Sequence, residues 1–204
     1  HVKSENYLSI LEVIKSKNHN SRLVGGVVRD AILGIDAEDI DIATSMLPEE
    51  VMMVFSSLGY KVIPTGIRFG TVSVLHNGEL FEITTLRKDI SSDGRHSKVE
   101  YTDDFYLDAL RRDFTINALS YCPFEEKIFD YFGGIKDLES GVVRFIGDAD
   151  LRIKEDYLRI LRFFRFFGKF GNKIDQNSLN FCIKNKSFIK NLSRERIKSE
   201  FDLI

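Results

Sequence analysis

The sequence contains only two cysteines, Cys122 and Cys182, among 204 residues. Neither lies in a Cys-x-x-Cys pair or beside a cluster of cysteines and histidines, which argues against a disulfide framework and a zinc site. The chain also lacks an apolar run of about 20 residues, the length that a membrane-spanning helix requires. No secretory signal is visible in the first residues, His1-Val2-Lys3-Ser4. We therefore expect a protein of a reducing compartment, the cytoplasm, that has no membrane partner.

The two ends of the chain indicate a fragment of a longer protein. Residue 1 is histidine rather than methionine, and the last residues, Phe201-Asp202-Leu203-Ile204, lie inside a helical pattern. A chain of this length forms one large domain or two small ones. The sequence carries no signal for an oligomeric state.

Charge is distributed unevenly along the chain, although the net charge is only −2. Residues 1–143 carry 15 basic and 23 acidic side chains, whereas residues 144–200 carry 14 basic and 7 acidic ones. An acidic segment followed by a basic one suits cation binding in the first and polyanion binding in the second. An ordinary solvated charged surface explains the same asymmetry, so charge alone does not distinguish it from cation and polyanion binding.

Hydrophobic periodicity changes near residue 147. Before it, strand-like alternation mixes with helical patterns; after it, the pattern is helical, with breaks near 168–172 and 191–193. We expect an α/β (α+β) domain over residues 1–147 and an all-helical part over 148–204. The expected helices of the first part are Tyr7–Lys17, Val27–Leu33, Pro48–Leu58 and Phe105–Ser120, and its expected strands are Ser21–Val24, Asp39–Thr44, Lys61–Ile63, Gly70–Leu75, Leu80–Thr85, Ile128–Tyr131 and Val142–Phe145.

Two stretches of turn-forming residues lie between these elements. Asn77-Gly78 joins two expected strands and is a strong hairpin signal, because both residue types tolerate positive φ. Arg87–Asp104 is polar and contains Ser91-Ser92-Asp93-Gly94, so we expect a mobile loop there.

Asp39 and Asp41 alternate with Ile40 and Ile42 on one expected strand. Residues i and i+2 of a strand point to the same face, so the two carboxylates project side by side. They repel each other unless a cation lies between them, and oxygen ligands without histidine or cysteine favour Mg²⁺. Two such ions about 3.5–4 Å apart can hold the attacking and leaving oxygens of an in-line displacement. A half-buried strand with a solvated acidic face is the alternative.

A glycine pair before these aspartates strengthens the metal hypothesis. Gly25-Gly26 joins an expected strand to an expected helix, which lets a phosphate approach backbone amides at a helix N-terminus. Arg29 adds a positive charge one turn into that helix. Gly26, Arg29 and the acidic pair together predict a triphosphate and metal site. Glu82 would be a third carboxylate if its strand neighbours the acidic one; otherwise it is a surface glutamate.

Five segments, in order, resemble the motifs of class II CCA-adding enzymes, which are tRNA nucleotidyltransferases, and of their relatives the bacterial poly(A) polymerases. The resemblance begins near residue 20 and continues to the end of the chain. Five ordered motifs are far more specific than any one of them. They are Gly25-Gly26-Val27-Val28-Arg29-Asp30 with Asp39-Ile40-Asp41-Ile42-Ala43-Thr44-Ser45, then Arg111–Leu119, then Asp130–Gly134 with Asp137-Leu138, then Glu155–Arg159, and last Arg194–Ile197 with Glu200.

This resemblance implies a polymerase-beta-like nucleotidyltransferase head over 1–147, followed by a helical neck and the beginning of a body over 148–204. It implies that C and A are added without a template, from CTP and ATP and with Mg²⁺, to the 3′ end of tRNA. Asp39, Asp41 and Glu82 would be catalytic, and Asp39 and Asp41 would hold the metal.

The resemblance also implies which side chains bind the nucleotide. Asp156 and Arg159 are three residues apart, so on one helix they share a face and match the amino group and ring acceptor of cytosine and adenine. An ordinary surface ion pair is the alternative for these two, as a salt-bridging Arg111-Arg112 pair is for the second motif. The phenylalanines from Phe163 to Phe167 are expected in the core. The complete expected set is Gly26, Arg29, Arg112, Asp113, Asp156, Arg159, Arg162 and Arg165, the last two meeting phosphates.

Two features bear on which nucleotides are added. Asp93-Gly94-Arg95-His96 resembles the loop that CCA-adding enzymes need for the final A. Arg68-Phe69 stands where family members often have a histidine, and it resembles poly(A) polymerases instead. A poly(A) polymerase and a partial (CC- or A-only) adding enzyme are therefore alternatives. A non-catalytic RNA-binding module is a third, although such a module needs neither the Asp39–Asp41 pair nor a base reader.

Overall fold

The structure is a computed structural model that describes residues 5–37, 39–90 and 98–204. The chain forms two compact units, and it passes between them three times. The division expected at residue 147 falls inside the second unit, because the segments around Phe114 and Phe145 pack with the C-terminal helices. Unit 1 is His1–Arg111 with Leu119–Tyr131, and unit 2 is Arg112–Ala118 with Phe132–Ile204.

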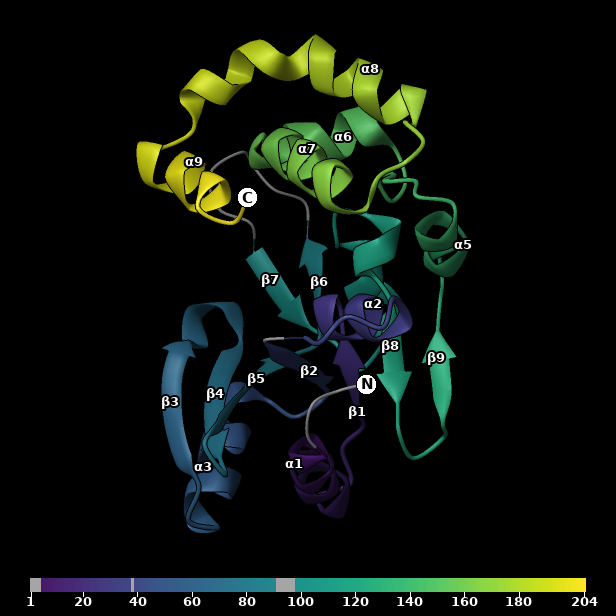
Figure 1. Ribbon diagram of the computed structural model, residues 1–204. Helices are drawn as coiled ribbons and strands as arrows, with labels where there is room; N and C mark the ends of the chain where they lie inside the picture. The colour runs from purple at the N-terminus through teal and green to yellow at the C-terminus, as the bar shows by residue number, and fades with distance from the viewer. Residues whose placement is uncertain (1–4, 38, 91–97) are drawn as a thin grey trace. The chain divides into compact units, whose positions relative to one another are not determined.

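Unit 1 is built on a seven-stranded mixed sheet in the order β3-β4-β5-β2-β1-β8-β9 (Figure 1). β2 and β5 run parallel, and every other neighbouring pair in this sheet is antiparallel. The sheet confirms the expected mixture of strands and helices in this part of the chain. The strands are β1 (Ser21–Val24), β2 (Ile40–Thr44), β3 (Lys61–Gly66), β4 (Thr71–His76), β5 (Glu79–Thr85), β8 (Ser120–Cys122) and β9 (Lys127–Phe129).

The Asn77-Gly78 hairpin is confirmed between β4 and β5. Both turn residues have positive φ, 50° for Asn77 and 81° for Gly78. This is the backbone twist that matches the twist of the flanking strands. The turn therefore sets the register that pairs Ser73 with Glu82.

The described residues of unit 1 include the helices α1 (Asn6–Ser16), α2 (Gly26–Ile32), α3 (Pro48–Ser57) and α4 (Phe105–Leu110). The first three pack against the sheet (Figure 1) and bury apolar side chains such as Ile10, Val27 and Phe55. On the sheet, Ile42 and Ile83 are fully buried register partners, so they lie on the same face. That face forms the core, which leaves the opposite face of β2 and β5 for polar residues.

The polar segment Arg87–Asp104 is not a loop throughout. Its ends form a two-stranded antiparallel sheet of β6 (Arg87–Ile90) and β7 (Lys98–Tyr101). The expectation overlooked that cross-strand backbone pairing can hold a polar ribbon without an apolar pattern. The expected Asp93-Gly94-Arg95-His96 element lies outside the described residues.

Two other expected elements are wrong. The helix expected over Phe105–Ser120 ends at Leu110, because Phe114 is extended and forms a β-bridge with Phe145, and Ser120 begins β8. A single 3₁₀ turn, η2 (Thr115–Asn117), lies between them. Val142–Phe145 contributes only that bridge and no strand. In both cases tertiary pairing overrides the local pattern.

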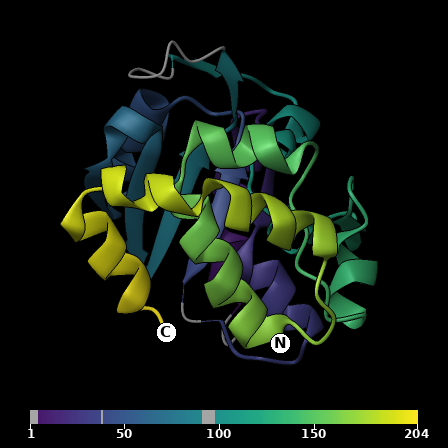
Figure 2. The same cartoon turned by 90° about the horizontal axis from the view of Figure 1, so that it is seen from above.

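Unit 2 is helical and confirms the pattern after residue 147. Figure 1 and Figure 2 show α8 lying over α6 and α7. Its core is aromatic: Phe114, Phe145, Phe163 and Phe166 are buried, and their ring centroids are 4.7 to 6.2 Å apart. The helices are α5 (Gly134–Glu139), α6 (Ala149–Glu155), α7 (Leu158–Phe170), α8 (Gln176–Asn185) and α9 (Arg194–Phe201), with a 3₁₀ segment, η3 (Lys186–Asn191).

Candidate functional site

Asp41 and Glu82 lie side by side on the polar face of the sheet in unit 1. They are register partners on the parallel strands β2 and β5, so their side chains point to the same face. Ile40 and Ile42, the neighbours of Asp41, are buried at 7% and 0% exposure, as the alternation predicts. The strand of Glu82 is therefore the direct neighbour of the strand that carries Asp41, as a role for Glu82 as a third carboxylate requires.

Asp39 occupies a different local position from Asp41. It precedes β2 by one residue and is exposed. Among residues 5–37, 39–90 and 98–204, no group of three or more His, Cys, Asp and Glu side chains is arranged to hold a metal ion. The structure thus brings Asp41 and Glu82 together but does not gather Asp39 with them into a three-carboxylate cluster. Asp39, Asp41 and Glu82 all offer carboxylate oxygens, which are the type of ligand that Mg²⁺ prefers.

The Gly25-Gly26 turn joins β1 to α2 and confirms the expected strand–turn–helix order. Gly25 has φ 72° and ψ −127°, a backbone conformation that L side chains rarely adopt. Gly26 begins the helix, and a Cβ built on it would lie 3.4 Å from Nη2 of Arg29. The guanidinium therefore lies beside the start of the helix, where no side chain stands between them.

Arg29 is buried at 7% exposure. Its Nε donates to Oδ1 of Asp30 at 2.8 Å, and its Nη2 lies 2.8 Å from the same oxygen. Asp30 accordingly fixes the orientation of a charge that sequence reasoning had treated as a lone arginine. A fixed guanidinium next to backbone amides is suited to phosphate oxygens.

In unit 2, Asp113 is buried and lies at the centre of a polar network. Its Oδ1 accepts hydrogen bonds from the backbone N–H of Phe114 at 2.7 Å and from Nδ2 of Asn117 at 3.3 Å. Its Oδ2 accepts from Nε of Arg162 at 2.7 Å. The neighbouring Arg112 offers its carbonyl oxygen to Nη2 of Arg152 at 2.5 Å. Asp113 is thus held in one orientation from both of its oxygens.

The same network continues through Arg162 and Arg165 to Glu200. Glu200 is buried at 7% exposure and accepts from Nη1 of Arg162 at 3.4 Å and from Nε of Arg165 at 2.8 Å. Burial disfavours the charged guanidinium of Arg162, but the charge and hydrogen bond of Asp113, with Glu200, outweigh it and raise its pKa. Both arginines, expected to meet phosphates, are paired with carboxylates of unit 2.

Asp156 and Arg159 do not share one helix, which corrects the expectation of a continuous helical face. α6 ends at Glu155, Asp156 is extended with φ −157° and ψ 105°, and α7 begins at Leu158. The break follows because the Asp156 carboxylate accepts the backbone N–H of Leu158 at 3.2 Å, as a helix cap does. The Asp156 backbone carbonyl accepts the N–H of Arg159 at 3.0 Å, so the two residues remain adjacent.

Acidic and basic neighbours that were not assigned as site residues hold these two side chains. Nη2 of Arg196 lies 2.8 Å from Oδ2 of Asp156. Nη1 of Arg159 donates to Oε2 of Glu155 at 2.5 Å and to the carbonyl of Arg152 at 2.8 Å. Glu155 and Arg196 both lie in segments singled out by motif, so the sequence marked them without indicating their contacts.

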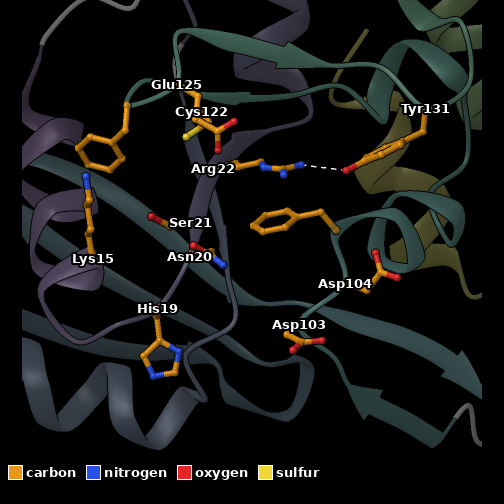
Figure 3. Close-up of a pocket in the computed structure, with 12 residues that line it drawn as sticks. Lys15, His19, Asn20, Ser21, Arg22, Asp103, Asp104, Cys122, Glu125 and Tyr131 are labelled. Atoms are coloured by element: carbon orange, nitrogen blue, oxygen red, sulfur yellow. Dashed lines mark hydrogen bonds between the residues drawn. The ribbon is translucent and has the colours of Figure 1, made fainter.

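A polar cavity of about 550 Å³ lies elsewhere in unit 1 (Figure 3). Arg22 forms one wall: its guanidinium lies 3.9 and 3.4 Å from the ring centroids of Phe105 and Phe129, and it donates to Tyr131 Oη at 3.0 Å. On another wall, Nζ of Lys15 lies 4.2 Å over the Phe124 ring. Because its two cations already pack on the protein's own aromatic rings, this cavity is a poorer ligand site than the Asp41–Glu82 face.

The helices within the described part of the chain include none that is both long and apolar enough to cross a membrane. Both cysteines are buried free thiols.

The chain is similar to known proteins over most of its length. The family described as the poly(A) polymerase head domain matches residues 21–144. The human mitochondrial CCA tRNA nucleotidyltransferase 1 is 42% identical over 205 residues, which cover 98% of this chain and 47% of that protein. The chain thus spans about half the length of the curated relatives it matches.

Solved structures are similar over the same extent. The Bacillus stearothermophilus CCA-adding enzyme in complex with CTP superposes with a TM-score of 0.87 at 34% identity, over 98% of this chain and 47% of that one. A tRNA nucleotidyltransferase complexed with a primer tRNA and an incoming ATP analogue superposes with a TM-score of 0.79 at 29% identity, over 95% of this chain and 55% of that one.

Proposed function

The chain belongs to the poly(A) polymerase head domain family, and from that premise we propose that it is the catalytic part of a CCA-adding tRNA nucleotidyltransferase. Its substrates are CTP, ATP and the 3′ end of a tRNA. In the reaction, the terminal 3′ hydroxyl attacks the α-phosphorus of the nucleotide, a new phosphodiester bond forms, and pyrophosphate leaves. Relatives named CCA tRNA nucleotidyltransferase or CCA-adding enzyme, and similar solved structures with CTP and with primer tRNA, support these assignments.

The observation that carries the proposal is the Asp41–Glu82 pair on adjacent parallel strands. Two carboxylates at neighbouring register positions repel each other, and a bound cation relieves that repulsion. Asp39 supplies a third oxygen donor two residues before Asp41. We infer that Asp39 and Asp41 hold Mg²⁺, with Glu82 beside them. Bound Mg²⁺ would neutralise charge on the reacting phosphate and lower the pKa of the attacking hydroxyl.

The residues that we propose to bind the nucleotide occur in both units. In unit 1, Gly26 and Arg29 bind triphosphate oxygens, because the helix start and the fixed guanidinium both favour anions. In unit 2, Arg112 and Asp113 contact the incoming nucleotide. Arg162 and Arg165 are proposed to contact phosphate through guanidinium N–H groups other than those that donate to Asp113 and Glu200.

Base selection falls to Asp156 and Arg159. A carboxylate accepts from the exocyclic amino group that cytosine and adenine share, and a guanidinium donates to their ring acceptors. Guanine and uracil present a carbonyl instead, which leaves the carboxylate unpaired and repelled. The break between α6 and α7 does not weaken this role, since a cap residue and a residue in the following first turn remain neighbours.

A poly(A) polymerase or a partial (CC- or A-only) adding enzyme is the second candidate. Arg68-Phe69 favours the poly(A) branch, because that branch carries the same pair where CCA-adding relatives often have a histidine. As to location, two free thiols suit a reducing compartment, which we propose is the cytoplasm. The human relative is named as mitochondrial, so membership of the family does not fix the compartment.

The test is an incorporation assay with a tRNA that lacks its 3′ CCA, Mg²⁺, and each nucleoside triphosphate singly and mixed. We expect addition to stop after C, C and A, as read on a denaturing gel. Unlimited addition of A identifies the poly(A) alternative, and absence of any incorporation contradicts both. Asp41→Asn should lower the rate at least about a hundredfold through loss of a metal ligand. Glu49→Gln, at an exposed carboxylate of α3, is the matched control and should leave the rate unchanged.

A further inference from the structure

The short turn η1 (Ile67–Phe69) between β3 and β4 exposes an aromatic side chain that the proposed chemistry does not use. Phe69 is 64% exposed, and Ile67 and Arg68 beside it are exposed as well. A single exposed apolar side chain is common on protein surfaces, so exposure alone means little. The residues around the Phe69 ring indicate whether it can serve as a binding surface.

The backbone under this ring is fixed from several directions. Nη1 of Arg87 donates to the Phe69 carbonyl at 2.8 Å, and the N–H of Thr85 donates to the Gly70 carbonyl at 2.9 Å. Gly70 has φ 78°, and a Cβ there would lie 3.0 Å from Cε1 of Tyr101. Figure 1 shows the β3–β4 connection next to β7, in agreement with this contact. Phe69 is therefore presented on a rigid support, so little entropy is lost when a partner stacks on it.

A positive charge accompanies the ring. Arg68 is exposed and forms no ion pair or hydrogen bond with any residue that the structure describes. Lys88 on the adjacent β6 lies 3.5 Å from Glu100, so its charge is partly offset. An exposed aromatic face next to an unpaired guanidinium is the combination that binds single-stranded nucleic acid, by base stacking and phosphate contact.

The turn also lies close to the carboxylate pair along the sheet. Thr71, the first residue after η1 and Gly70, pairs with Thr84 on β5. Thr84 is two residues from Glu82, which is roughly 7 Å along a strand. A nucleic-acid strand whose end reaches Glu82 would thus pass within a few nucleotides of η1.

We propose that Phe69 is a stacking platform for a base near the 3′ end of the acceptor RNA strand, and that Arg68 contacts the adjacent phosphate. The proposal rests on the proposed function, because it takes the acceptor to be RNA. It assigns this surface to the acceptor strand and not to the incoming nucleotide.

The experiment measures the affinity of the protein for a tRNA lacking its 3′ CCA by fluorescence anisotropy, without nucleotide. We expect Phe69→Ala to weaken binding about tenfold, since base stacking is lost, and Phe69→Tyr to stay within about twofold because the aromatic face remains. Arg68→Ala should reduce the slope of log affinity against log salt by about one, whereas Phe69→Ala should leave the slope unchanged. Met53→Ala, which removes a 66% exposed side chain from α3, is the matched control and should have no effect.

Unchanged RNA affinity in Phe69→Ala would overturn the proposal. A raised KM for the nucleoside triphosphate with unchanged RNA affinity would also overturn it, because it would assign the ring to the incoming nucleotide. Since binding is measured without catalysis, failure of the incorporation assay and failure of this inference remain distinguishable. Circular dichroism of each variant checks that the fold is retained.

Discussion

At the scale of single residues, the carboxylate of Asp156 shows how a site side chain is prepared. One oxygen accepts the N–H of Leu158 and the other lies 2.8 Å from Nη2 of Arg196. Each carboxylate oxygen has two lone pairs, so both can still accept a further hydrogen bond from a base. The Asp156 carboxylate is therefore held in one orientation and still has free hydrogen-bond acceptor capacity.

We therefore predict that Asp156→Ala loosens base choice more than it slows addition. The ratio of kcat/KM for CTP to that for UTP should fall by at least about tenfold, because the acceptor for the exocyclic amino group is lost. Arg196→Ala removes the same ion pair but keeps the carboxylate, so this control should retain most of the discrimination. An unchanged CTP/UTP ratio in Asp156→Ala would refute the base-reading role.

At the scale of elements, the β1–α2 connection depends on one backbone conformation. Gly25 accepts φ 72° and ψ −127° because it has no Cβ, and its N–H donates to the carbonyl of Leu119 at 3.0 Å. A different conformation would move the start of α2, together with Gly26 and Arg29, away from the end of β1. The proposed triphosphate site thus depends on this turn.

Gly25→Ala should therefore destabilise the protein by about 1–3 kcal/mol, the cost of forcing a non-glycine residue into such a conformation. Gly168→Ala is the matched control, because Gly168 lies within α7 and a Cβ there meets nothing within 4 Å. That change should stabilise the protein by about 0.5–1 kcal/mol. Urea unfolding of the two variants measures both effects, and equal midpoints would contradict the argument.

At the scale of the whole molecule, the change in sequence pattern near residue 147 does not coincide with the boundary between the two compact units. The sequence pattern becomes helical near residue 147, and the family match ends close by, at residue 144, although the last strand, β9, ends at Phe129. Compact packing places Phe114 and Phe145 with Phe163 and Phe166 in unit 2 instead. A cut at 147 would separate two halves of one aromatic core.

A fragment of residues 1–147 should consequently fold poorly. It retains Phe114 and Phe145 but loses the α7 rings that bury them, so apolar surface is exposed to water. We expect stronger binding of a hydrophobic dye and a broader, less cooperative thermal transition than in the complete chain. A fragment that unfolds as sharply as the complete chain would show that the boundary at 147 is also a packing boundary.

The sequence by itself determined the family and the order of most elements, and it predicts the chemical character of the site. Motif identity survives without coordinates because glycine turns, hairpin turns and alternating carboxylates are local signals, and Gly25, Asn77-Gly78 and Asp41 all lie where the local pattern predicts. It failed at Phe105–Ser120, where Phe114 forms a bridge with Phe145, and at Arg87–Asp104, where the two ends of the segment pair with each other without an apolar pattern.

Only the tertiary structure decided which side chains meet. That Glu82 is the register partner of Asp41 depends on β5 pairing with β2, across 41 residues of chain. The pairing of Arg162 with Asp113 and Glu200, and of Asp156 with Arg196, likewise joins residues about 40 to 50 positions apart. Such contacts are set by the burial of distant apolar faces against one another, and no local pattern encodes them.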